Sequence, residues 1–239
     1  MCSTKSRLFV LLFFSLVLSI LVFAVMKRNM AELTAAISNQ PITFIIDAGH
    51  GGEDGGAVGV EGTTESRINL SIALRLEQFL EFCGYQTQMI RTTDVSVYTQ
   101  GDTIAERKVS DLKKRVELVN HVDPAILISI HQNHFSEEQY SGAQVFYSAV
   151  SGSKELAEEM QNTLRYTLDP NNRREIKRAD SVYLLEKARC PAVLVECGFL
   201  SNSREEQLLL NSDYQKKIIC AITCALTDHV SKGADELEV

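Results

Sequence analysis

The sequence predicts an α/β protein with a single domain, in which a mostly parallel, twisted sheet is covered by helices on both faces. An N-terminal transmembrane or signal-anchor helix is expected to precede it. Three observations support this prediction. Short apolar runs alternate with segments of helical periodicity from Pro41 onward, which is typical of parallel sheets with two covered faces. The length of 239 residues favours one domain, and the first 40 residues contain one long apolar stretch.

That stretch, residues 8–26, is nearly unbroken over nineteen residues, about the length that a helix needs to cross a bilayer. A cleaved signal peptide has a shorter apolar region, and the nearest small-residue cleavage site, at 33–38, lies beyond several polar residues. We therefore favour an uncleaved anchor. Basic residues on both sides leave its orientation open: Lys5, Arg7, Lys27 and Arg28. We expect the remainder to be exported, since all the candidate chemistry lies there.

The remaining elements follow from apolar spacing. Short apolar runs predict strands at 42–47, 85–91, 125–130, 142–148 and 192–196. Apolar residues at three- and four-residue spacing predict helices at 63–84, 110–122, 153–168 and, as one or two closing helices, 204–230. Thr63 or Thr64 can cap the first helix, Gly84 can end it, and Ser110 can cap the second. The polar stretches 92–109 and 170–181 are expected to be surface loops.

These elements divide the chain into an anchor and linker at 1–40, a catalytic domain at 41–232 and an acidic tail at 233–239. The first 40 residues contain four of the 24 basic residues and one of the 31 acidic ones, so the exported part has a formal charge of −10. That balance argues against binding nucleic acid, whose phosphates require a basic surface. The six cysteines form no CxxC motif, and we expect free, buried thiols.

Candidate functional residues gather at one edge of the predicted sheet. His50 stands just past the first strand, His131 follows the strand at 125–130, and Glu196 closes the strand at 192–196. Glu65 opens the helix that returns from the first loop. The carboxyl ends of parallel strands meet at one edge, where ligands bind in open α/β sheets. Two histidines and two glutamates from four separate segments are therefore expected to converge.

This set of side chains suits a metal-assisted hydrolase. Two imidazoles and one carboxylate form an open zinc site of the catalytic kind, and a further carboxylate can act as general base and then as general acid. The loop around His50 holds six of the chain's thirteen glycines, which allow the tight backbone that such a site needs. A phosphate-binding loop is disfavoured because GK[ST] and GxGxxG are missing and because Glu53 and Asp54 would repel phosphate. The sequence assigns no function to Glu53 or Asp54.

Three motifs, in order, resemble the zinc-dependent N-acetylmuramoyl-L-alanine amidases of the amidase_3 family. They are "IIDAGHGGEDGGA" with Glu65 just after it, "SIHQN" at 129–133 and "PAVLVECGFLSN" at 191–202, and the resemblance spans about 42–232. It implies one Zn²⁺ per chain held by His50, Glu65 and His131, with Glu196 as the catalytic carboxylate. The implied reaction is hydrolysis of the amide between N-acetylmuramic acid and L-alanine in peptidoglycan.

The resemblance also bears on the remaining polar residues of the motifs. Asn133 matches the family's HxN and is expected to orient the site. Cys197, beside the catalytic acid, is expected to be a packing residue. The other histidines have no counterpart and are expected at the rim: His121, His134 and His229.

The short, anchored layout is similar to the sporulation and germination-specific amidases of the CwlD type, which prepare spore cortex peptidoglycan for muramic δ-lactam formation. It implies a place at the outer face of the cytoplasmic membrane or in the intermembrane space of the forespore, with the N-terminal helix in the membrane. Since no wall-binding module is recognisable, an accessory protein that targets or activates the enzyme is a hypothesis. Two alternatives stay open: another zinc hydrolase of the wall, a peptidase or deacetylase, and an inactive wall-binding protein.

Overall fold

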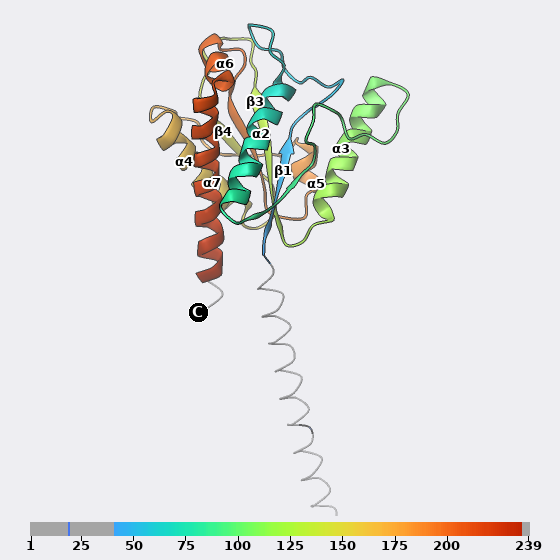
Figure 1. The fold of residues 1–239 in the computed structure, drawn as a ribbon, viewed down its shortest axis with the longest axis vertical. Coiled ribbons are helices and arrows are strands. Elements are labelled where there is room, and N and C mark those ends of the chain that lie inside the picture. The colour runs from blue at the N-terminus through green and yellow to red at the C-terminus, as the bar shows by residue number, and fades with distance from the viewer. Residues whose placement is uncertain (1–18, 20–40, 236–239) are drawn as a thin grey trace, which may run out of the picture. The chain divides into compact units, whose positions relative to one another are not determined.

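The computed structural model describes Ser19 and residues 41–235, and the latter form an α/β unit (Figure 1). Its strands are β1 (Thr43–Ala48), β2 (Gln86–Met89), β3 (Ala125–Asn133), β4 (Gln144–Tyr147), β5 (Lys177–Arg178) and β6 (Ala192–Phe199). Its helices are α2 (Glu65–Phe82), α3 (Ile104–Asn120), α4 (Ser153–Leu168), α5 (Tyr183–Lys187), α6 (Ser203–Leu210) and α7 (Ser212–Asp235).

The six strands form one mixed sheet in the order β2-β1-β3-β6-β4-β5. Four neighbouring pairs are parallel, as predicted, but β4 runs antiparallel to β6. The connection from β3 to β4, residues 134–143, contains no helix. A parallel return needs a crossover of a dozen or more residues, so this short connection sends β4 back in the opposite direction.

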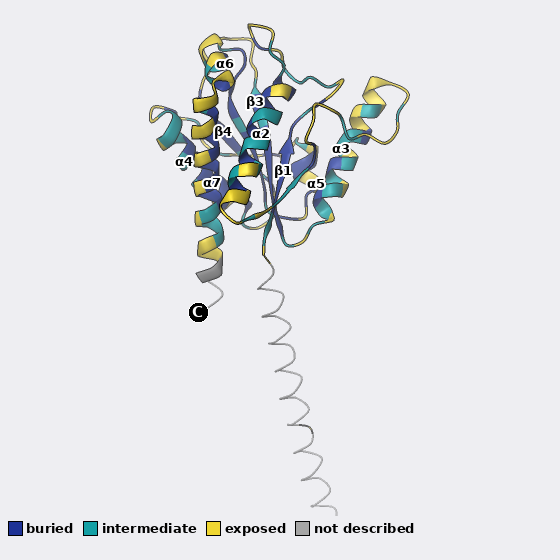
Figure 2. Cartoon of the chain, viewed as in Figure 1, coloured by how far each residue is buried: buried dark blue, intermediate teal, exposed yellow. Residues whose placement is uncertain are grey.

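Helices cover both faces of the sheet, as the alternation of elements predicted. The larger apolar core lies between one face and α2, α4 and α7, and includes Ile72, Leu156 and Ile222. A smaller core, which includes Ile45, Leu127 and Leu194, lies on the opposite face beneath α3 and α5. In Figure 1 α2, α4 and α7 stand together on one flank and α3 stands beside α5 on the other. The central strands β1 and β3 are dark with burial in Figure 2, whereas β2 and β5, at the two edges of the sheet, are half-buried or exposed.

Several predicted boundaries are wrong in informative ways. Helix α3 begins at Ile104 rather than near residue 110, because Thr103 and Glu106 form a capping box that closes its first turn. Ser110 lies inside that helix, where its hydroxyl accepts hydrogen bonds from two backbone N–H groups of the preceding loop. Strands β3 and β6 continue past their apolar runs to Asn133 and Phe199. The short elements β5 and α5 were not predicted.

The predicted buried thiols are confirmed at only two positions. Cys190 and Cys197 are buried, and five of the six cysteines are described and free. The other three, Cys83, Cys220 and Cys224, are exposed. Residues four apart share one helix face, and for the last two that face points away from the core.

The predicted anchor, residues 8–26, lies outside the described residues except for Ser19. Among the residues that the structure describes, no helix combines the length and the apolar character needed to cross a bilayer.

Candidate metal centre

Strand register places three site residues in one row across the sheet. His131 on β3 pairs with Glu196 on β6, and Glu196 pairs with Gln144 on β4. Residues directly opposite each other on paired strands point to the same face. That face carries Leu127 and Leu194, so the row lies on the side of α3 and α5, at the carboxyl end of the parallel strands.

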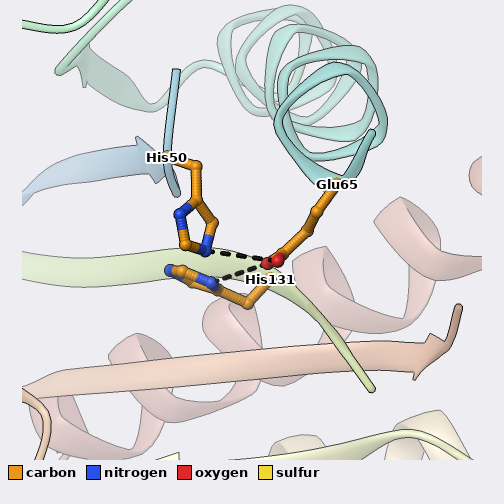
Figure 3. Close-up of side chains that lie close together, drawn as sticks. All are labelled: His50, Glu65 and His131. Atoms are coloured by element: carbon orange, nitrogen blue, oxygen red, sulfur yellow. Dashed lines mark hydrogen bonds and ion pairs between the residues drawn. The ribbon is translucent and has the colours of Figure 1, made fainter. Parts of the chain in front are cut away.

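Three side chains from separate segments point toward one another at this edge (Figure 3). His50 comes from the loop after β1, Glu65 from the first residue of α2, and His131 from β3. His50 Nε2 lies 3.2 Å from Glu65 Oε2, and His131 Nδ1 lies 2.9 Å from Glu65 Oε1. One nitrogen or oxygen of each residue falls within 4.8 Å of the others. The predicted convergence of these three residues is therefore present.

The geometry fits a small metal ion. Zinc ligands lie about 2.0–2.2 Å from the ion, so neighbouring ligand atoms in a tetrahedral site are separated by about 3.3 Å. The nitrogen-to-oxygen separations of 2.9 and 3.2 Å, which involve different oxygens of Glu65, are close to that value, and the three ligand atoms all lie within 4.8 Å of one another. Two imidazole nitrogens and one carboxylate are also the donor set of open, three-ligand zinc sites.

The Glu65 carboxylate is held in its charged form. Oε1 accepts hydrogen bonds from the side chain of Asn69 and the backbone N–H of Gln132, and Oε2 accepts one from the backbone N–H of Ala57. Burial alone would raise the pKa of Glu65, but contacts with His131 and His50 outweigh it and lower the pKa well below its usual range. Glu65 is therefore an anion at every physiological pH.

His50 is oriented by Asp54, the loop acid to which the sequence assigned no function. Its Nδ1 lies 3.0 Å from Oδ2 of Asp54, which also pairs with Lys108 at 3.2 Å. Burial lowers the pKa of His50, but the carboxylates of Asp54 and Glu65 outweigh it and raise the pKa to about 9. Asp54 thus faces the outer nitrogen of His50, and Nε2 is left to face Glu65.

Two buried arginines fix the backbone of the His50 loop. Arg115 donates to the carbonyls of Ala48 and His50, at 3.1 and 2.6 Å, and Arg91 donates to those of Ala48 and Gly49, at 2.7 and 3.0 Å. His50 has a φ of 61°, a left-handed conformation that costs energy in a residue with a side chain. These bonds help to hold the loop in that strained form.

Arg115 also neutralises a buried carboxylate at the end of β1. Its Nη1 lies 2.5 Å from Asp47 Oδ1, and the Ser129 hydroxyl donates to Oδ2 at 2.6 Å. Burial alone would raise the pKa of Asp47, but Arg115 and Ser129 outweigh it and hold the pKa below its usual range.

We expect Arg115→Met to lower the free energy of unfolding by about 3–5 kcal/mol, because removing one partner of a buried ion pair leaves the other charge uncompensated. Denaturant unfolding measures the change. Lys114→Met on the same helix is the control, since among the described residues Lys114 pairs only with the exposed Glu117, and such pairs contribute about 0–1 kcal/mol. Equal losses in the two variants would contradict the role assigned to Arg115.

Glycines let the candidate ligands approach the loop. A Cβ built on Gly49 would stand 2.1 Å from Nε2 of His131, and one on Gly56 would stand 2.5 Å from Oε2 of Glu65. Gly56 also has a φ of 68°. The glycine content of the loop therefore reflects steric room for His131 and Glu65 as well as backbone freedom.

Glu196 lies beside the three candidate ligands with one oxygen unsatisfied. Its Oε2 is buried and has no hydrogen-bond partner among the described residues. Burial raises the pKa of Glu196 to about 7, helped by the nearby charge of Glu65 and opposed by His131 and His50. A carboxyl that exchanges its proton near neutrality suits a general acid or base.

This raised pKa has a consequence for stability. A carboxyl whose pKa is higher in the folded state than in the unfolded state lowers the stability of the fold as pH rises. The loss begins near the pKa of the unfolded state, about 4.3, and is complete above the pKa of the folded state, about 7. We expect metal-free Glu196→Gln to be about 3 kcal/mol more stable than the metal-free parent at pH 8, and equal to it at pH 4. Denaturant unfolding of both proteins at pH 8 and at pH 4 measures the difference in stability. The same difference at the two pH values would contradict the prediction.

The remaining predicted residues lie apart from this cluster. The Asn133 side chain accepts a hydrogen bond from the backbone N–H of His134 and makes none to the candidate ligands within the described part of the chain. His121 and His134 are exposed, and His229 pairs with Glu159 at 3.0 Å. Cys197 is fully buried in the larger core, as expected of a packing residue.

An α/β fold with two imidazoles and two carboxylates gathered at the carboxyl edge of its sheet defines a candidate metallohydrolase. A family model described as N-acetylmuramoyl-L-alanine amidase, Amidase_3, matches residues 44–228. The chain therefore belongs to the Amidase_3 family. Its enzymatic class is accordingly that of an N-acetylmuramoyl-L-alanine amidase acting on peptidoglycan.

Individual relatives agree with the family. The germination-specific N-acetylmuramoyl-L-alanine amidase of Bacillus subtilis (strain 168) is 35% identical over 195 residues, which are 81% of each chain. The CwlD amidase from Clostridioides difficile, solved in complex with the GerS lipoprotein, matches with a TM-score of 0.77 and 39% identity over 80% of this chain and 98% of that one. The N-acetylmuramoyl-L-alanine amidase from Clostridium difficile 630 matches with a TM-score of 0.70 and 31% identity, over 80% of this chain and 97% of that one.

Proposed function

We propose that this amidase holds one Zn²⁺ through His50, Glu65 and His131 and uses Glu196 as its catalytic carboxylate. The observation that carries the proposal is the mutual approach of the three candidate ligand side chains, with their nitrogen and oxygen atoms within 4.8 Å of one another. Zinc bound there would polarise the amide carbonyl and lower the pKa of a water molecule.

The protein's own residues supply the rest of the chemistry. Glu196 accepts a proton from the attacking water and delivers it to the nitrogen of L-alanine as the amide bond breaks. A metal binds the neutral form of an imidazole, so zinc would displace the proton that Asp54 and Glu65 favour on His50. Asp54 faces the outer nitrogen of His50, and the contacts of Glu65 with Asn69 and Gln132 fix its carboxylate.

Product analysis tests this function. The domain is incubated with purified peptidoglycan and with zinc, and the soluble products are analysed by mass spectrometry. We expect free stem peptides that begin with L-alanine, together with glycan that has lost them. Shortened peptides still attached to glycan would indicate a peptidase, and loss of acetyl groups would indicate a deacetylase.

We expect Asp54→Asn to weaken zinc binding or activity about 10- to 100-fold, the usual effect of removing a carboxylate that orients a metal-binding histidine. Titration with zinc in a competing chelator measures the affinity. Glu53→Gln is the matched control, because Glu53 is the neighbouring acid and, within residues 41–235, pairs only with Arg107. Unchanged zinc affinity and turnover in Asp54→Asn would show that the contact with His50 is incidental.

We further propose that the enzyme acts outside the cytoplasm in spore cortex maturation, where stem-peptide removal precedes muramic δ-lactam formation. The likeness to a germination-specific amidase and to CwlD supports this role. Residues 8–26 would serve as the membrane anchor. Deleting the gene in a spore-forming host tests the role, with muropeptide analysis of the spore cortex: the proposal requires muramic δ-lactam to disappear.

An accessory protein is part of the same proposal, since the CwlD amidase was solved together with the GerS lipoprotein. Affinity purification from sporulating cells, followed by activity measurements with and without the recovered partner, tests it. Recovery of this chain alone, with full activity in isolation, would exclude a required partner.

A further inference from the structure

The row of His131, Glu196 and Gln144 is continued by the side chain of Arg174. Its Nη1 lies 3.4 Å from Oε1 of Gln144, and its Nε donates to the Ser141 carbonyl at 2.8 Å. Gln144 is paired directly with Glu196. Gln144 therefore links the guanidinium to the strand position next to Glu196.

Aromatic side chains restrain the orientation of this guanidinium. Its central carbon lies 4.3 Å from the ring centre of Phe199 and 6.0 Å from that of Tyr140. Phe199 is fully buried, and its ring also contacts Phe135 and Tyr140. Stacking on a fixed ring restrains the flat guanidinium and leaves its edge available for a planar acceptor.

Arg174 differs from four of the five other half-buried or buried arginines in its partners; the exception is Arg75 on α2, which likewise has no carboxylate partner among the described residues. Within residues 41–235 Arg174 forms no ion pair with a carboxylate, and its Nη2 donates no hydrogen bond. Glu205 acts on it electrostatically, but the two Glu205 oxygens accept the backbone N–H groups of Gly142 and Phe199. By contrast, carboxylates pair with Arg91, Arg107, Arg115 and Arg165. A fixed cation with a free donor thus stands one strand away from Glu196.

A hollow of about 370 Å³ adjoins this cation. Arg174 and Tyr140 line it, with Asp169, Asn171, Asn172 and Arg173 among the other lining residues. Two arginines and one aspartate give the hollow a net positive charge, although the domain as a whole is acidic. Such a surface attracts an anionic group on a ligand.

We propose that Arg174 binds a carboxylate of the stem peptide on the leaving side of the scissile amide, namely the free α-carboxylate of the γ-linked D-glutamate that follows L-alanine. This proposal rests on the proposed amidase function. The muramic acid side of the bond has no free carboxylate once its lactyl group is in the amide, so the nearest anion belongs to the peptide. This carboxylate lies about two residue lengths, ~7 Å, from the scissile nitrogen, and Arg174 is hydrogen-bonded to the residue paired with Glu196 on the neighbouring strand.

The test compares two muramoyl tripeptides that differ only in this group: one with D-isoglutamate and one with D-isoglutamine. We expect the zinc-loaded parent enzyme to cleave the isoglutamate substrate with a kcat/KM about 10- to 100-fold higher, the usual range for a hydrogen bond to a charged group. Arg174→Met should lower kcat/KM to that extent on isoglutamate and leave the isoglutamine value unchanged. Arg174→Lys should restore part of the difference, and Arg189→Met, a change at an exposed arginine that does not line the hollow, should keep all of it.

A merely structural role predicts another pattern. Equal losses on both substrates in Arg174→Met, or a parent enzyme that does not distinguish the substrates, would overturn the proposal. Calorimetric titration with the dipeptide L-alanyl-D-glutamate and with its α-amide, L-alanyl-D-isoglutamine, gives a readout that does not need turnover. If the parent enzyme releases no stem peptide but binds the dipeptide acid more tightly than the amide, and loses that preference in Arg174→Met, the amidase function fails and the carboxylate site stands. Equal binding of acid and amide overturns the site.

Discussion

Glu196→Gln should lower kcat about 10²- to 10⁴-fold, the contribution typical of a positioned general acid or base, while zinc content stays near one ion per chain. Gln keeps the size of the side chain and its place opposite His131 on the paired strand. It cannot accept the proton of the attacking water. His50→Ala and His131→Ala should lower both turnover and zinc content, because each removes one of the three proposed ligand atoms.

Metal analysis of the purified variants, together with the stem-peptide assay, separates the two outcomes. If Glu196→Gln lost zinc as the histidine variants do, then Glu196 would be a ligand and the assignment would be wrong. A folded state of each variant, shown by circular dichroism, rules out global unfolding as the cause.

Gly49→Ala should lower zinc content and activity by about 10²-fold or more, the scale expected when a site group is displaced by about 1 Å. The new Cβ would lie 2.1 Å from Nε2 and 2.3 Å from Cε1 of His131. Backbone on both sides is fixed, because the Gly49 carbonyl accepts hydrogen bonds from Arg91 and Asn69. The imidazole is therefore the group that moves, and it moves out of reach of Glu65.

Gly55→Ala, in the same loop, is the matched control. Its Cβ would meet only the Thr64 side chain, at an ordinary contact distance of 3.5 Å. We expect near-normal zinc content and turnover there. Normal metal binding in Gly49→Ala would show that the loop can shift as a whole, and that the arginine contacts do not fix it.

The two expected results test different parts of the same site. Glu196→Gln removes a proton acceptor and leaves the metal ligands intact. Gly49→Ala keeps every reactive group and removes only the room that one ligand needs. Activity should be lost in both, but only the second should also lose zinc, so the pair distinguishes the chemistry of the site from its construction.

Sequence patterns were sufficient for the architecture and for the residues of the candidate centre. Apolar runs of strand length and helical periodicity located most elements, since both reflect local burial. His50, Glu65, His131 and Glu196 were identifiable because each adjoins a strand end or helix start, and such positions meet at one edge of a parallel sheet.

Other features of the structure leave little or no signal in the local sequence. The capping box at Thr103 lies within a polar stretch that otherwise looks like a loop, and it starts α3 earlier than predicted. Asp54 is evident in the loop sequence, but its contact with His50 depends on how the loop closes. Arg91 and Arg115 lie 42 and 67 residues from the loop carbonyls that they bind, and a charged residue in a polar segment looks like a surface residue.

The sequence by itself therefore determined the class of fold, the order of most elements and the four residues of the candidate centre. Only the tertiary structure decided that β4 runs antiparallel, that Gly49 makes room for His131, that two arginines fix the His50 loop and that Arg174 stands beyond Glu196. The physical reason is that burial and periodicity are properties of neighbouring residues, whereas register, steric room and ion pairing depend on segments that meet only when the chain has folded.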